Sequence, residues 1–163
     1  MCECKGEGKS VQLQVVKTYF DNGQKWYEYT KNEQGQKHGT FKRWYKNGLV
    51  HEHLEYVNGK LHGTLKRWYD NGHLWEHCEY LNNTVCGLYQ RNNDNGSIIQ
   101  IKQYINNLVL VQVNFTDANG NKLKKPILTI TEPNHANIGV GLIQVIKLLQ
   151  EKDIKFKIAK IGE

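Results

Sequence analysis

A repeat of 24 residues is the feature that most constrains the fold of this chain. Residues 38–45 read HGTFKRWY and residues 62–69 read HGTLKRWY, so the two segments are offset by 62 minus 38, or 24 positions. A weaker third copy begins at Cys86. Asn-Gly pairs keep nearly the same step along the chain, starting at Asn22, Asn47, Asn71, Asn95 and Asn119. A repeat of this length is typical of one supersecondary unit that stacks on its neighbours.

The Asn-Gly pairs predict that each unit is a β-hairpin. Asn and Gly both tolerate a positive φ, which a type I′ turn needs at its two central residues, so we expect type I′ turns at these pairs. A second turn between units is indicated at Asn58-Gly59, Asn82-Asn83 and Asn106-Asn107, which leaves strands near 49–57, 73–81 and 97–105. No stretch of the repeats is long enough for a helix, so the fold class is mainly β.

Equivalent positions of the units form columns whose character indicates burial. One column is without a polar member and should form the core: Val16, Phe41, Leu65, Tyr89 and Val113. Because successive side chains of a strand alternate, Trp44 and Trp68 should lie on the opposite face from Phe41 and Leu65. About ten strands spaced by about 4.8 Å would give an elongated single-layer sheet about 48 Å long.

The hairpin pattern stops after Pro126, which divides the chain into an N-terminus (1–10), about five hairpin units (11–126) and a C-terminal β-α-β segment (127–163). In that last segment a strand over 127–131 precedes a helix that begins after Asn137 and ends near Lys152 or Asp153. A closing strand follows from Ile154. We expect this segment to cap the open end of the sheet; dimerisation through it is the alternative.

The repeat unit carries a family resemblance. It reads Gly-x-x-x-x-Trp-Tyr-x-Asn-Gly followed by Glu-Tyr-x-Asn-Gly-Lys-Leu-His-Gly, and over residues 11–109 the chain resembles MORN repeats, in the variant of bacterial antitoxin-like repeat proteins and of amoebal and giant-virus proteins. The resemblance implies a string of hairpins used for protein contact, scaffolding or membrane association, often with self-association, and no chemistry of its own. The third well-aligned unit departs from the pattern at Cys86 and at Asn92-Asn93.

Metal binding and catalysis find no support in the residue pattern. His38, His62 and Cys86 are repeat equivalents, two strands or about 10 Å apart, and zinc ligands within about 2.3 Å of one ion cannot be spaced so widely. No nucleophile elbow and no phosphate-binding glycine loop is present. We therefore predict a protein without metal, cofactor or catalytic residues.

A protein partner is the expected ligand, and the candidate binding residues are Trp44, Trp68, Trp75, His51, Arg43 and Arg67. The Lys-Arg-Trp-Tyr stretches also combine cations with aromatic rings, as single-strand nucleic-acid sites do. However, neighbouring Lys and Arg should point to opposite faces, which predicts no continuous basic stripe, and glutamates on adjacent strands should neutralise them. Nucleic acid and an anionic membrane surface therefore stay as alternatives.

The chain carries a formal net charge of +6, and its N-terminus lacks the apolar stretch of a signal peptide. We therefore expect a cytoplasmic protein with free thiols. Two classes of function follow. One is an interaction or scaffolding module inside a larger assembly, such as a virion; the other is an antitoxin-like neutraliser of a toxin.

Overall fold

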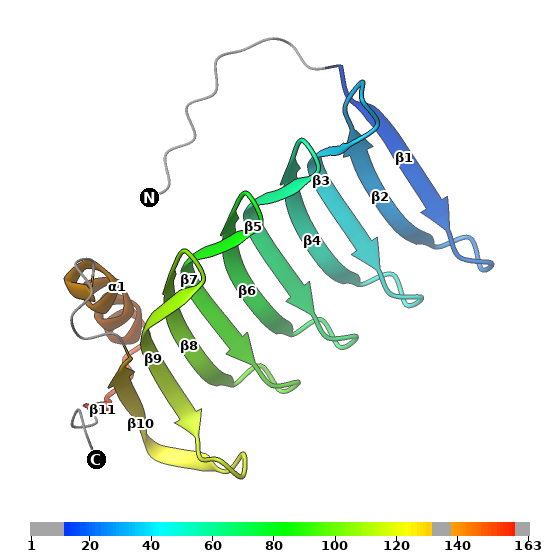
Figure 1. Cartoon of the computed structure of the whole chain (residues 1–163). Coiled ribbons are helices and arrows are strands. Elements are labelled where there is room, and N and C mark those ends of the chain that lie inside the picture. Colours follow the sequence, from blue (N-terminus) through cyan, green and yellow to red (C-terminus); the bar gives the residue numbers. More distant parts are fainter. Residues whose placement is uncertain (1–11, 132–137, 159–163) are drawn as a thin grey trace.

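A computed structural model describes residues 12–131 and 138–158 of the chain. Eleven strands form one sheet in which each strand pairs with the next in sequence, and Figure 1 shows the resulting open, single-layer meander with one helix at its C-terminal end. The predicted mainly β fold of tandem hairpins is confirmed.

The elements, in chain order, are β1 (Gln14–Tyr19), β2 (Lys25–Lys31), β3 (Lys37–Trp44), β4 (Val50–Val57), β5 (Lys60–Trp68), β6 (Leu74–Leu81), β7 (Thr84–Asn92), β8 (Ile98–Ile105), β9 (Leu108–Thr116), β10 (Lys122–Ile130), α1 (Ile138–Glu151) and β11 (Lys157–Ile158). All pairs are antiparallel except β10 with β11, which is parallel. Asn137, the predicted start of the helix, lies outside the described residues.

The turns at the Asn-Gly pairs are not of the predicted type I′. In the β3–β4 hairpin, Gly48 N donates to Tyr45 O at 3.0 Å and Tyr45 N donates to Leu49 O at 2.9 Å. Only the glycine has a positive φ, at 85°, whereas Asn47 does not. This is the pattern of a three-residue loop, in which a type I turn is followed by a left-handed glycine. The prediction placed the Asn and the Gly at the two central positions of a two-residue turn. In the structure they are the second and third residues of a three-residue loop.

Type I′ geometry occurs instead in the turns between units. Both central residues have positive φ at Asn58-Gly59 (47° and 78°), Asn82-Asn83 (51° and 68°) and Asn106-Asn107 (48° and 68°). The first unit differs because Gly35 N donates to Asn32 O, which makes that turn one residue longer. This longer turn accounts for the single 25-residue step between the first two Asn-Gly pairs.

A glycine in the second strand of each inter-unit pair produces a large bulge. Three residues of β5 (62–64) lie opposite the single residue Glu55 of β4. Gly63 has φ of 96°, and a Cβ there would lie 2.1 Å from Glu55 Oε2. The carboxylate occupies that space and accepts a hydrogen bond from Thr64 N at 2.7 Å. Glycine is therefore required both by the backbone conformation and by the neighbouring side chain.

The last inter-unit pair, β8 with β9, lacks this glycine, and the change in register that results forms the apolar core. Val111 occupies the position that Gly63 and Gly87 have in earlier units. Here β9 has only one extra residue, Leu110, relative to β8. A β-branched residue resists positive φ, so the two-residue bulge is lost. A register change of one residue reverses the faces of a strand. Val113 consequently leaves the column predicted for it and lies across from Ile101 on the other face.

Helix α1 packs on the face that this register change makes apolar. Val145 and Leu149 of the helix are fully buried against a cluster of fully buried residues from the last strands: Ile101, Leu110, Val111, Val113 and Leu128. Gly141 allows the close approach, because a Cβ there would lie 2.8 Å from Gln103 Cγ. The helix thus covers the C-terminal part of the sheet through contacts with β7, β8 and β9.

Candidate functional site

The strand register sorts the side chains of the repeats onto two faces. One face carries Phe41, Leu54 and Leu65, which are cross-strand partners on β3, β4 and β5. Arg67 lies on the same face, two residues further along β5. We call this side the Arg67 face. Lys42, His53 and Lys66 are likewise opposite one another, one residue out of phase, on the side that we call the Lys66 face.

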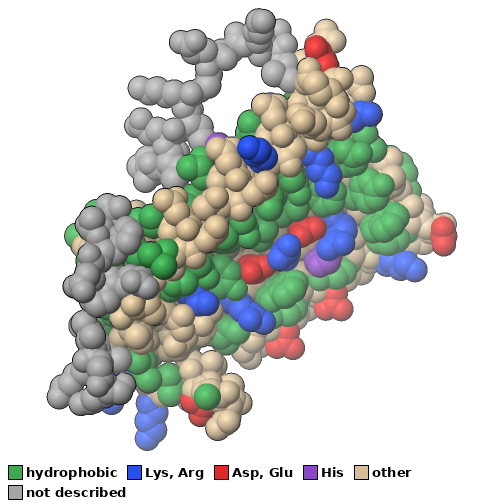
Figure 2. Space-filling view, viewed as in Figure 1, with side chains coloured by type: hydrophobic (Ala, Val, Ile, Leu, Met, Phe, Trp, Pro, Cys, Tyr) green, Lys and Arg blue, Asp and Glu red, His purple; other side chains and the backbone are tan. Residues whose placement is uncertain are grey.

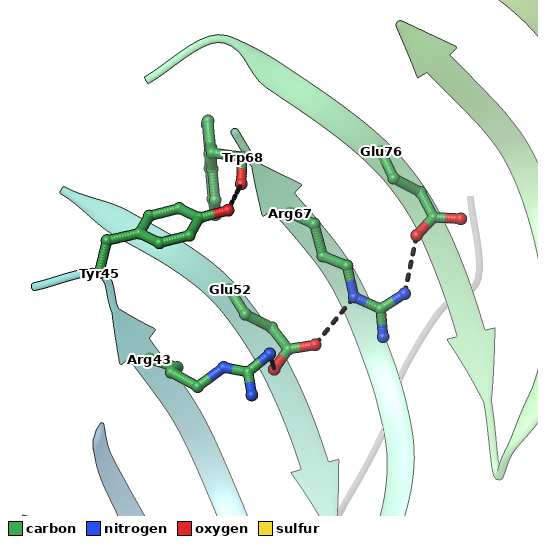
Figure 3. A network of polar contacts seen from close by, with 6 residues as sticks. All are labelled: Arg43, Tyr45, Glu52, Arg67, Trp68 and Glu76. Carbon is green, nitrogen blue, oxygen red and sulfur yellow. Dashed lines mark hydrogen bonds and ion pairs between the residues drawn. The ribbon is translucent and has the colours of Figure 1, made fainter. Parts of the chain in front are cut away.

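On the Arg67 face, arginines and glutamates alternate from strand to strand. Arg67 Nε lies 2.8 Å from Glu52 Oε1, and Arg67 Nη1 lies 2.8 Å from Glu76 Oε2. Arg43 Nη2 lies 3.5 Å from Glu52 Oε2, so Glu52 is held between two arginines (Figure 3). Figure 2 shows this row of alternating charges flanked by hydrophobic side chains. The prediction that glutamates on adjacent strands neutralise the cations is confirmed for Arg43 and Arg67.

Apolar and aromatic side chains fill the remaining area of the Arg67 face. Leu54, Leu65 and Cys78 are buried there, and burial raises the pKa of the Cys78 thiol to about 12. Lys37 Nζ lies 4.5 Å from the centre of the Phe41 ring and 5.1 Å from that of Tyr56. This face is therefore packed by its own side chains, and the charges at its centre, on Arg43, Glu52, Arg67 and Glu76, are paired within the chain.

The structure divides the predicted binding residues between the two faces. Trp44 and Trp68 follow Arg43 and Arg67 in their strands and so lie on the Lys66 face, where Lys25 Nζ is 4.7 Å from the Trp44 ring centre. The prediction that these tryptophans lie opposite Phe41 and Leu65 is confirmed by the register.

The other predicted residues belong to the Arg67 face. The Trp75 ring centre lies 6.0 Å from Arg67 Cζ, and His51 packs on Tyr45 with ring centres 4.3 Å apart. Tyr45 Oη donates a hydrogen bond to the carbonyl oxygen of Trp68 at 2.8 Å, which ties consecutive units together (Figure 3). The six candidates therefore do not form one site.

The Lys66 face carries a row of lysines and histidines that the sequence analysis did not identify. Lys42, His53, Lys66 and His77 are consecutive cross-strand partners on β3 to β6, and we call these four residues the Lys66 row. The prediction that neighbouring Lys and Arg point to opposite faces is confirmed by the register, and in the row each lysine is followed by a histidine on the next strand.

The two histidines of the Lys66 row are held in their neutral form. Burial lowers the pKa of His53, and the neighbouring charges of Lys42 and Lys66 lower it further, against an opposing effect of Glu55. Burial and Lys66 lower the pKa of His77 in the same way. Neutral imidazoles spaced between lysines avoid the direct like-charge pairs that would destabilise the ladder.

The ends of the row differ in character. Toward β1, Glu28 pairs with Lys25 at 2.8 Å and with Lys17 at 3.8 Å, so that part is compensated. Toward the C-terminus the same line of partners continues as Gln90 and Ile101, which leads under α1. Within residues 12–131 and 138–158, the part of this face that has no ion pair and no covering helix therefore runs from β3 to β6.

Among the residues that the structure describes, no three His, Cys, Asp or Glu side chains are grouped as a metal site would require. In the same described part of the chain, no helix has the length and apolar character needed to cross a membrane. Repeat-equivalent side chains are separated by whole hairpins, which keeps the histidines apart.

Comparison with known families decides what the repeats are. A family model described as a MORN repeat variant matches the chain twice, at residues 37–58 and 61–82. Residues 37–58 and 61–82 are thus two repeats of this MORN variant. Each MORN match coincides with one hairpin, β3–β4 or β5–β6, and together they contain the whole Lys66 row. MORN repeats are generally associated with modules that bind proteins or membranes. No curated protein and no solved structure matches the chain.

Proposed function

We propose that this MORN-repeat chain is a non-enzymatic module for protein–protein interaction or scaffolding, and that it binds its partner through the Lys66 face. The observation that carries the proposal is the contrast between the two faces. On the Arg67 face, Arg43, Glu52, Arg67 and Glu76 are paired at 2.8 to 3.5 Å. The Lys66 row instead lines up two lysines and two histidines without a carboxylate between them.

The Lys66 face also offers the aromatic side chains that interfaces favour. Trp44 and Trp68 are half-buried on this face and flank the Lys66 row on the equivalent strands β3 and β5. Tryptophan is enriched among the residues that dominate binding energies. A partner lying along the sheet would therefore contact the same combination of residues in each of two consecutive units, as expected for a scaffold built from repeats.

The repeat architecture supports binding rather than catalysis. Glu52, which is buried, and Glu76 are engaged by Arg67 and have a structural role. General acid–base catalysis needs a titratable group that can reach a bound substrate, and these groups are held in ion pairs within the sheet.

The proposal is tested by quantitative affinity capture with the tagged chain and with two variants. The Trp44→Ala/Trp68→Ala variant should lose its partner, since both tryptophans lie on the proposed binding face. The matched control is Trp75→Ala, which removes a half-buried tryptophan from the Arg67 face and should retain the partner. Circular dichroism of each variant establishes that it is folded.

The opposite pattern would overturn the proposal: loss of the partner with Trp75→Ala and retention with the double variant. If the double variant unfolds, the tryptophans are structural. Binding is then measured with Lys42→Gln/Lys66→Gln, which changes charge on the same face without removing a large side chain, and an unchanged partner would again refute the proposal.

A further inference from the structure

We propose that the Lys66 row is a binding track for an extended acidic segment of a protein partner; this inference builds on the proposed function of the Lys66 face. The track runs across β3, β4, β5 and β6, along the long axis of the sheet, and not along any one strand.

The spacing of the row fits an extended peptide. Neighbouring strands lie about 4.8 Å apart, so four residues on four strands span about 14 Å. In an extended peptide, side chains on one side recur every second residue, or about every 6.8 Å. About three acidic residues at alternate positions of a partner would therefore cover the whole Lys66 row.

The charge of the row is available to a partner. In the described strands β3 to β6, the carboxylates of this face lie outside the row, at Glu55 and Glu79, and both are held at the glycine bulges. Glu55 accepts the hydrogen bond from Thr64 N and fills the space beside Gly63, while the Glu79 carboxylate fills the equivalent space beside Gly87. Lys66 thus faces a histidine on each side across the ladder, whereas Lys42 faces His53 on one side and Glu28 on the other.

The histidines make the charge of the Lys66 row depend on pH. An acidic side chain lying over the row would favour the charged form of His53 and His77. The groups that face His53 are Lys42, Lys66 and Glu55, and those that face His77 are Lys66 and Glu79. Since both lysines oppose protonation, a bound anion would relieve the repulsion.

The observations favour an acidic peptide over a nucleic acid. Single-strand binding requires an aromatic ring face on which bases stack. The ring of Trp44 already has the Lys25 ammonium over it at 4.7 Å, and Lys25 is itself paired with Glu28. The row also supplies only two fixed positive charges, fewer than the series of phosphate contacts that gives nucleic-acid binding its strength.

The test uses fluorescence anisotropy with the full chain and a labelled peptide in which glutamate and serine alternate. The wild-type chain should bind it, and a glutamine–serine peptide should not bind. Lys42→Gln/Lys66→Gln should weaken binding by about tenfold, as expected for the loss of two charge contacts. The matched control Lys124→Gln/Lys125→Gln removes the same charge from exposed positions of β10 and should change affinity less than about twofold.

Acidification provides an independent readout of the same track. Lowering the pH from 7.5 to 6 should tighten binding of the wild-type chain, because the histidines become charged beside an anion. The His53→Gln/His77→Gln variant should bind with an affinity that does not change over this range. Glutamate side chains of the peptide stay ionised there, so the change is assigned to the protein.

Several outcomes would overturn the inference. Equal losses in the two lysine variants would show general charge attraction, and absence of glutamate-peptide binding would exclude the track. Tighter binding of an oligothymidine or of vesicles containing an anionic phospholipid, with the same dependence on Lys42 and Lys66, would assign the row to those ligands. If Trp44→Ala/Trp68→Ala still abolishes partner capture while the peptide does not bind, the proposed function stands and the acidic track does not.

Discussion

Single glycines at the inter-unit bulges determine which side chains share a face of this protein. Gly63 combines a positive φ with a neighbouring carboxylate that occupies the position of a Cβ. Where valine replaces glycine, at Val111, the bulge shrinks by one residue and the faces of the following strand are reversed. The alternation of strands was therefore predictable from the sequence up to β8, but the prediction for Val113 was wrong because the consequence of losing this glycine was not considered.

The glycine at position 63 is expected to be far more sensitive to substitution than a turn glycine. Gly63→Ala should reduce the free energy of unfolding by about 2 to 4 kcal/mol, because left-handed backbone strain adds to the clash with Glu55. Gly23→Ala is the control, since Gly23 has φ of 81° but nothing within 4 Å of the added Cβ, and it should cost about 1 kcal/mol. Urea denaturation measures both; equal costs would contradict the role of the carboxylate.

Three histidines should make the stability of the sheet fall in mild acid. Burial lowers the pKa of His51, His53 and His77 in the folded state from the ordinary value of 6.5. The unfolded chain therefore takes up protons first, and stability is lost as the pH falls below about 6.5. Thermal unfolding at pH 7.5 and 5.5 should show a lower Tm at the acidic pH. Replacing all three histidines by glutamine should remove most of the difference; a higher Tm in acid would contradict the assignment.

At the scale of the elements, asparagine side chains join the first four hairpins to one another. Asn71 Oδ1 accepts a hydrogen bond from His73 N within its own turn, while Asn71 Nδ2 donates to Asp94 O of the following turn at 2.7 Å. Asn47 makes the same pair of contacts with Leu49 and Asp70. The repeat of 24 residues was sufficient to predict the hairpins and their order. It did not give the turn types, because those depend on which residue pairs close each hairpin.

Loss of an inter-hairpin asparagine contact should be measurable. Asn71→Ala should destabilise the chain by about 1 kcal/mol more than Asn95→Ala, because both lose the bond within their own turn and Asn71 also loses the bond to the next hairpin. The comparison uses urea denaturation at neutral pH. Equal effects of the two substitutions would show that the contact between turns contributes no net stability.

Helix α1 has a buried side and an exposed side, which allow a matched test. Val145 is fully buried against the last strands, whereas Val140 is 61% exposed. Val145→Ala should cost about 2 kcal/mol, and Val140→Ala should leave the free energy of unfolding within about 0.5 kcal/mol of the wild type. A larger cost at Val140 would indicate that the exposed side of the helix packs on a second copy of the chain.

Over the whole molecule, burial is distributed unevenly. The cluster of fully buried residues lies at the C-terminal end, where α1 contacts β7, β8 and β9. The two MORN-matched hairpins leave the Lys66 face without a covering element in the described structure. The Lys66 row on that face could not be predicted from the positions of lysine and arginine alone. It required the register between strands, which aligns the histidines with the lysines.

The central claim, that this protein binds its partner on the Lys66 face, is tested most directly by lysine footprinting of the captured complex. Acetylation is compared by mass spectrometry in the free chain and in the complex. Lys42 and Lys66 should become protected on binding, whereas Lys102, which lies across from Tyr89 on the Arg67 face, should react at the same rate in both. Protection of Lys102 with unchanged reactivity of Lys42 and Lys66 would contradict the account.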